Sequence, residues 1–151
     1  MIRISFTAAR ELTGLHTAGT TVVLSFSAAE LTPSRNVSKD EQRSLSGRRE
    51  TLRHVTKRAW SITTGPLDGA ALDEVIEFIS SCDGGEVFTF EPWRHESGPS
   101  LDLDFTTARF RVGETIPCVL DGSSFQLDRL VGDGTGGAND VYQVSFQVAE
   151  A

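Results

Sequence analysis

The sequence predicts a mainly β protein with one α-helix, either a β-sandwich or a split barrel, in which the helix packs on the sheet. Two observations lead to this fold class. Apolar and polar residues alternate with a period of two in many short segments, as in half-buried strands. Strong helical spacing of apolar residues occurs in one segment, residues 68–83. A single amphipathic helix needs a sheet to cover its apolar face, and the alternating segments would supply that sheet.

The chain has 151 residues, and we expect residues 1–151 to form a single domain with a real core. The hydrophobic content of 38% and the 14 glycines are typical of a soluble protein rich in turns. No apolar run approaches the ~20 residues of a membrane span. The N-terminus lacks the continuous apolar stretch of a signal peptide, so cytosolic synthesis is expected.

The predicted helix has recognisable ends. Asp68 is a predicted N-cap, because its carboxylate can accept from the unpaired amides of the first turn. Gly84 and Gly85 are predicted to end the helix, because glycine adopts the left-handed conformation without a Cβ penalty. The acidic residues predicted on the polar face are Asp73, Glu74 and Glu77. The predicted core, from the helix and its neighbouring strands, comprises Trp60, Ile62, Leu72, Val75, Ile76, Ile79, Phe88, Phe90, Val144 and Phe146.

An extended hairpin is predicted around residues 35–64. Arg43–Arg53 would form a strand that pairs with Ala59–Thr64 across a turn near residues 54–57, with a bulge at Gly47. Residues 31–39 are polar and contain a proline, which predicts a loop. The other predicted strands are residues 2–6, 22–26, 87–90, 101–106, 110–112, 115–120, 124–130 and 142–148, with a turn at Asp121-Gly122 between the sixth and the seventh of these.

The sequence contains no constellation typical of catalysis, so we expect neither an enzyme nor a cofactor or metal. The three histidines, His16, His54 and His95, lie far apart in predicted turns and loops. Asp102 and Asp104 share the polar face of a predicted strand, and residues 132–140 lack the spacing of a calcium loop. Cys82 and Cys118 match no metal spacing and are predicted to be free, semi-buried thiols.

Charge is distributed unevenly along the chain, whose net charge is −7. Residues 35–58 hold eight basic and three acidic residues, a net charge of +5, and the rest holds six basic and 18 acidic residues, a net charge of −12. The basic segment could contact nucleic-acid phosphates, dock on the acidic surface of a neighbouring copy, or be a solvated hairpin. It lacks the aromatic residues of a single-strand binder, so docking on a neighbouring copy is favoured. The predicted subunit interface comprises Arg43, Arg48, Arg49, Arg53, Lys57 and Arg58.

The segment from Gln42 to Trp93 resembles the distal tail proteins of long, non-contractile-tailed phages and the related lambda-type minor tail proteins. The resemblance rests on RSLSGRRET, on a strand with RAWSITTGPL, on the helical LDEVIEFISSCDGG and on VFTFEPW. These motifs cover about a third of the chain, whereas residues 1–31 and 132–140 match nothing in that family.

The resemblance implies a virion protein, assembled in the host cytoplasm into a hexameric ring that joins the tail tube protein to the tail hub or tip proteins, without membrane contact. It also implies that DNA passes through the lumen without specific binding, which an acidic lumen would favour by repelling phosphates. The residues alone leave an alternative open, a small β-sandwich module that binds carbohydrate or another ligand. Only Trp93 would offer such a module an aromatic platform.

Overall fold

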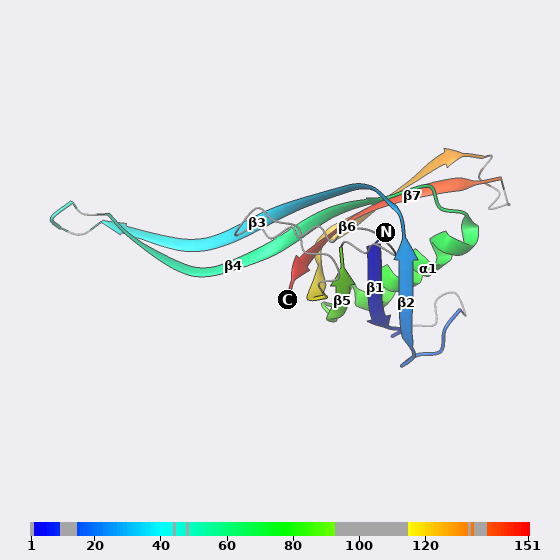
Figure 1. Ribbon diagram of the computed structural model, residues 1–151, viewed down its shortest axis with the longest axis horizontal. Helices are drawn as coiled ribbons and strands as arrows, with labels where there is room; N and C mark the ends of the chain where they lie inside the picture. The colour runs from blue at the N-terminus through cyan, green and yellow to red at the C-terminus, as the bar shows by residue number, and fades with distance from the viewer. Residues whose placement is uncertain are drawn as a thin grey trace, which may run out of the picture.

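The computed structural model describes residues 2–9, 15–43, 45–47, 49–92, 115–132, 134 and 139–151, and of residues 36–40, 50–56 and 123–124 the backbone alone. The described strands form one antiparallel sheet of seven strands in the order β2-β1-β5-β6-β7-β4-β3 (Figure 1). The elements are β1 (Ile2–Thr7), β2 (Thr21–Phe26), β3 (Ala28–Arg43), β4 (Arg49–Thr64), α1 (Gly69–Cys82), β5 (Phe88–Glu91), β6 (Ile116–Val131) and β7 (Val141–Glu150). The prediction of a mainly β protein with one helix is confirmed.

The sheet curls so strongly that its two edges approach each other. The edge strands β2 and β3 are consecutive in the chain, and Ser27 alone separates them. The amide of Gly65, which follows β4, donates to the carbonyl oxygen of Ser27 over 2.6 Å, so the β3–β4 ladder continues into the corner between the two edge strands. The described strands therefore form an open, barrel-like sheet, as in the split-barrel alternative, rather than two stacked sheets.

The helix packs on the inner face of the curled sheet. Phe78 of α1 is fully buried and touches three separate strands. Its ring packs edge-to-face against Phe6 of β1, Phe88 of β5 and Phe146 of β7, with centroid distances of 5.3, 4.9 and 5.8 Å. One aromatic ring thus joins the helix to the neighbouring strands β1 and β5 and to β7, which β6 separates from β5 in the sheet.

Both ends of the helix match the prediction. Oδ1 of Asp68 accepts a hydrogen bond from the amide of Ala71 over 2.8 Å. The helix ends at Cys82, and Gly85 takes the left-handed conformation with φ of 92°. The predicted core residues are all buried except Ile76, which is partly buried and packs against the core.

The prediction that Glu77 lies on the polar face of the helix is wrong. Glu77 is only 1% exposed, and its Oε2 lies 2.6 Å from Nδ1 of His16. The curled sheet covers one side of the helix, and the loop that carries His16 covers another. The buried arc of α1 is therefore wider than the spacing of its apolar residues indicates.

β3 and β4 form one long hairpin with 16 residues in each strand. The predicted loop at residues 31–39 is wrong, because these residues continue β3. Pro33 is compatible with that strand because β3 is an edge among the described strands, where one side of the backbone needs no ladder partner.

The predicted turn near residues 54–57 is also wrong. Ser38 pairs with Val55 and Lys39 pairs with Arg53, so His54 has no partner on β3. His54 is therefore the extra residue of a β-bulge. The chain reverses farther out, between β3 and β4, where Gly47 takes φ of 78° in a turn rather than marking a strand bulge.

The predicted turn at Asp121-Gly122 is a bulge as well. β6 continues through it, but its register against β7 shifts between Asp121 and Gln126. Residues 122–125 therefore face the single residue Phe146 and protrude from the ladder. The strands predicted at 101–106 and 110–112 lie outside the described residues.

Candidate assembly interface

The outer part of the β3–β4 hairpin projects beyond the rest of the sheet as a two-stranded arm (Figure 1). We define the arm as residues 35–58, because the pairs between β4 and β7 begin at Ala59. The ladder from the Arg35–Arg58 pair to the Arg43–Arg49 pair spans roughly 25 Å at the usual rise of a strand.

Both edges of the arm lack a neighbour among the described strands. One edge belongs to β3, and the other is the part of β4 from Arg49 to Arg58. Unpaired N–H and C=O groups on such edges are ready to pair with another chain, and an isolated two-stranded hairpin is marginally stable in water. The arm therefore has the properties of a segment that another chain covers by strand addition.

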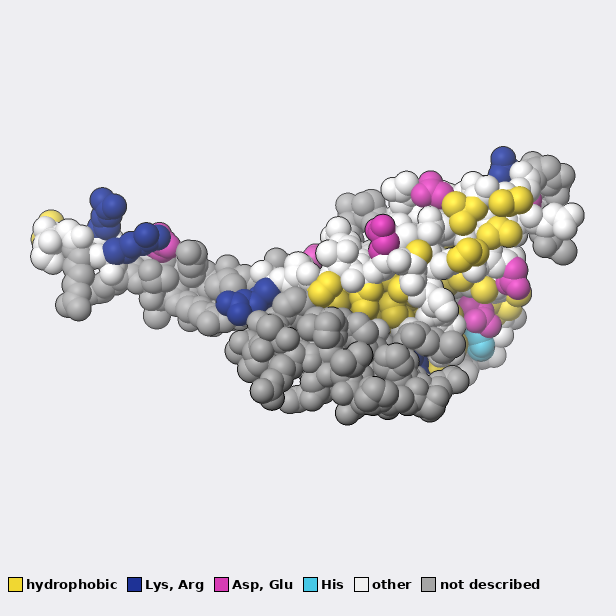
Figure 2. Space-filling view, turned by 45° about the horizontal axis from the view of Figure 1, so that its top comes forward, with side chains coloured by type: hydrophobic (Ala, Val, Ile, Leu, Met, Phe, Trp, Pro, Cys, Tyr) yellow, Lys and Arg dark blue, Asp and Glu magenta, His cyan; other side chains and the backbone are white. Residues whose placement is uncertain are grey.

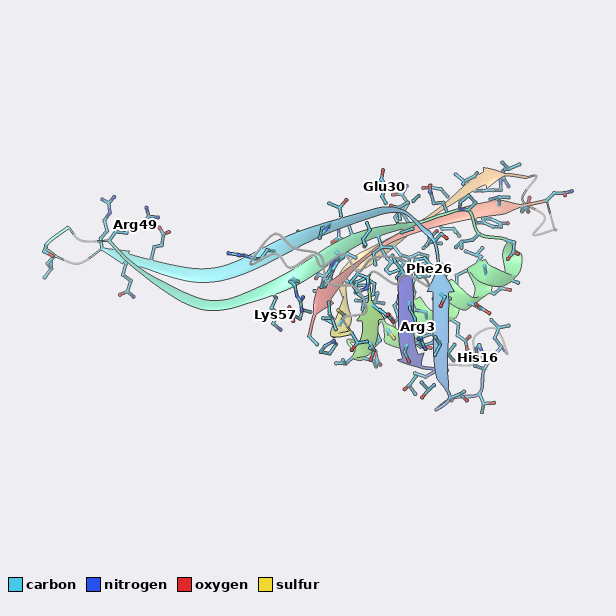
Figure 3. All side chains as sticks on the ribbon, in the orientation of Figure 1. Arg3, His16, Phe26, Glu30, Arg49 and Lys57 are labelled. Atoms are coloured by element: carbon cyan, nitrogen blue, oxygen red, sulfur yellow. The ribbon has the colours of Figure 1, made fainter. Side chains whose placement is uncertain are left out.

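The described basic side chains of the arm other than Arg58 are exposed: Arg35, Arg43, Arg49 and Lys57. Arg49 lies near the tip and Lys57 near the base of the arm (Figure 3). Arg49 also forms an ion pair with Glu41 on the opposite strand. Of the other predicted interface residues, Arg48 lies outside the described residues and Arg53 is described by its backbone alone. Contact of these residues with a second copy stays a prediction.

Arg58 has a different role at the base of the arm. Its Nη2 donates to Oε1 of Glu150 over 3.1 Å, and its Nε and backbone amide both donate to Oε2 over 3.2 Å. These hydrogen bonds hold the pKa of the Glu150 carboxyl below its usual range. The Arg58 guanidinium also lies 5.7 Å from the ring centroid of Trp60. Arg58 thus anchors the arm to β7 and the core, and a subunit contact through it would have to break this network.

A cavity of about 340 Å³ lies beside the bulge of β6, and we call it the bulge cavity. Ile79 of α1 and Phe146 of β7 line it with buried apolar surface. Asp83 and Asp121 bring exposed carboxylates to it, and Phe125 adds a half-exposed ring. The sequence pattern did not predict this cavity, although a glycine inside an alternating segment is a known signal of a bulge.

Exposed apolar side chains gather on the same strand. Phe125, Leu127, Leu130 and Val131 of β6 are between 43% and 62% exposed. Figure 2 shows apolar side chains on this part of the surface, together with acidic ones, and basic side chains on the arm. A contiguous apolar patch on a protein surface marks a site of interaction. Leu45 at the tip of the arm is fully exposed as well.

The described residues bring together no catalytic constellation. His16 is paired with Glu77, His54 is described by its backbone alone, and His95 lies outside the described residues, as do Asp102 and Asp104. Within the described part of the chain, no group of three or more His, Cys, Asp or Glu could hold a metal ion. The described helix is too short and too polar to cross a membrane.

Asp140 organises the described part of the loop at residues 132–140. It is buried, its Oδ1 accepts from the amide of Gly134 over 3.3 Å, and its Oδ2 accepts from the hydroxyl of Tyr142 over 3.2 Å. Its carboxylate therefore holds the ends of the β6–β7 hairpin together.

Cys82 and Cys118 are free, as predicted, and they are fully buried rather than semi-buried. Burial, aided by nearby acidic groups, raises the pKa of each thiol to about 12. We therefore expect both thiols to react slowly in the folded protein.

No protein-family model and no curated protein matches this chain. A solved structure described as "Tail of empty GTA particle computed with helical refinement, C6 symmetry" is similar to it. The two share 21% sequence identity with a TM-score of 0.44, over 99% of this chain and 90% of that chain. This degree of likeness assigns the chain to no family.

Proposed function

We propose that this chain is a structural subunit of the tail of a long-tailed phage or phage-like particle, and that its copies form a ring between the tail tube and the hub or tip proteins. The observation that carries the proposal is the arm, whose two edges have no neighbour among the described strands. Two strands alone are marginally stable over roughly 25 Å in water, and the described residues supply the arm with no third strand, so a strand of a second chain would stabilise it.

The charges support a second copy of the same chain as that partner. The arm carries a net charge of +5 and the rest of the chain −12, so an arm attracts the body of another copy while two bodies repel each other. The hexameric copy number, the location in the virion, and the passage of DNA through the lumen are what the sequence resemblance implies.

The test is the oligomeric state of the purified full chain, measured by light scattering and negative-stain imaging. We expect ring-shaped oligomers. A matched variant, in which an Asn-Gly turn replaces residues 36–57, should keep the circular dichroism of the body and stay monomeric. A full-length protein that is monomeric at every concentration, and absent from purified tail particles, would contradict the proposal.

A further inference from the structure

We propose that the arm tip of one copy docks in the bulge cavity of a second copy, with Leu45 as its apolar anchor. This inference rests on the proposed ring assembly and names the two surfaces that make its contact. Such a contact has three requirements. The anchor side chain must be exposed in its own chain, the cavity must match it in size and charge, and the arm tip must be too far from the cavity of its own copy to reach it.

Leu45 is the anchor. It is the most exposed large apolar side chain among the described residues, at the end of an arm whose other described tip side chains are polar or charged. An exposed leucine contributes nothing to the stability of its own hairpin, but burying it in a partner removes its apolar surface from water.

The bulge cavity matches the arm tip in chemistry. Its buried side chains, Ile79 and Phe146, offer apolar contact, and its volume of about 340 Å³ accommodates a leucine side chain. Asp83 and Asp121 at the cavity are acidic, whereas Arg43 and Arg49 flank Leu45 on the two strands of the arm. An apolar centre between opposite charges is the usual arrangement of a specific contact.

The arm tip of a copy cannot reach the bulge cavity of that same copy. Gln147 at the cavity pairs with Ser61 of β4, and Arg49 at the arm tip is twelve residues away along the same strand. At the rise of a strand this separation is about 40 Å. The contact therefore joins two different surfaces of two copies, and such heterologous contacts generate closed rings or filaments rather than two-fold dimers.

The neighbouring edge of β6 can extend the contact. β5 pairs with β6 only from Ile116 to Cys118, and from Val119 onward that edge has no partner among the described residues. A strand of the arm that arrived at the cavity could add main-chain hydrogen bonds along this edge, next to the exposed apolar side chains of β6.

Cysteine cross-linking tests the contact directly, because both native cysteines are buried and do not compete. L45C and F125C proteins are prepared separately, mixed, allowed to assemble and mildly oxidised. We expect a covalent dimer in the mixture and not in either variant alone. Rings that assemble from the mixture without this cross-link would overturn the docking but leave the proposed function standing, whereas a protein that never assembles would overturn both.

A second measurement uses variants that leave the body unchanged. L45D should weaken association at least about tenfold in sedimentation, and L15D, at another exposed leucine, should not. Equal effects of the two variants would overturn the proposal. So would protection of the F125C thiol from alkylation in monomeric protein, because the chain itself would then cover the cavity.

Discussion

The ring of Phe26 in β2 lies with its centroid 6.2 Å from that of Phe146 in β7, although three strands separate β2 from β7 in the sheet. In a flat sheet, strands four positions apart would lie about 19 Å from each other. The contact is possible only because the sheet curls back on itself, and it closes the inner side of the barrel beside the helix.

Removing this contact should destabilise the fold strongly. Phe26 is only 6% exposed, so we expect Phe26→Ala to lower the free energy of unfolding by about 3–5 kcal/mol, measured by urea denaturation. The control is Val23→Ala on the same strand, where the side chain is 50% exposed and the loss should stay below about 1 kcal/mol. Similar losses of unfolding free energy for both variants would mean that any truncation in β2 destabilises the fold, and that the contact with Phe146 adds nothing specific.

Local sequence patterns predicted the elements of the body but not the turns. The helix and β7 appear where they were expected, because their patterns depend on which side of one element is buried. Val144 and Phe146 alternate in β7, Val75 and Ile79 have helical spacing in α1, and all four are buried. Pro33 and the Asp121-Gly122 pair are turn signals in isolation. Whether such a residue reverses the chain or sits in an edge strand or a bulge depends on its pairing with distant strands.

The same limit applies to the candidate interface. The basic segment could be predicted, because charge is visible along the sequence. The hydrogen bonds between Arg58 and Glu150 could not be predicted, because the two residues are 92 positions apart and meet only through the pairing of β4 with β7. The bulge cavity likewise depends on a register shift between β6 and β7, which the sequence does not reveal. Leu45 can be identified as a candidate anchor only from its exposure in the structure.

Two glycines provide a matched test of the β6–β7 hairpin. Gly132 and Gly122 both have positive φ, 118° and 81°, so alanine is strained at either position. A Cβ at Gly132 would also clash with Oδ1 of Asp140, whereas at Gly122 it would meet nothing within 4 Å. We expect Gly122→Ala to cost about 1 kcal/mol and Gly132→Ala clearly more, measured by thermal denaturation. A Gly132→Ala variant as stable as Gly122→Ala would show that Asp140 can move away without loss.

The hydrogen bonds between Arg58 and Glu150 should make the free energy of unfolding depend on pH. The pKa of Glu150 is lowered in the folded protein, so its contribution is present above the unfolded-state pKa of about 4.5 and is lost as the pH falls through the folded value. Glu150→Gln should therefore lower the free energy of unfolding by about 1 kcal/mol at pH 7, and the difference from the unchanged protein should shrink below pH 4.5. Melting curves of both proteins between pH 7 and pH 3 measure this difference in stability. A difference that stays constant over this range would mean that the Glu150 carboxylate does not stabilise the fold through Arg58.

The cysteines should report on global unfolding. With the pKa of Cys82 and of Cys118 at about 12, the thiolate fraction at pH 8 is on the order of 1 in 10,000. Iodoacetamide should therefore leave the native protein unmodified over hours and add two groups in urea, as mass spectrometry would show. Rapid modification of one cysteine in native protein would reveal local opening near it.

The charges at the arm tip should control assembly in a salt-dependent way. Arg43→Glu reverses a charge that is expected to face acidic groups of the next copy, so association should weaken several-fold at low salt and less at high salt, where charges are screened. Arg35→Glu is the matched control, because it changes the net charge of the arm equally at its base. Adding Asp121→Lys to Arg43→Glu should restore association if the two side chains meet across the contact. Equal effects of Arg43→Glu and Arg35→Glu, with no restoration by Asp121→Lys, would mean that the arm attracts its partner by overall charge and not through its tip.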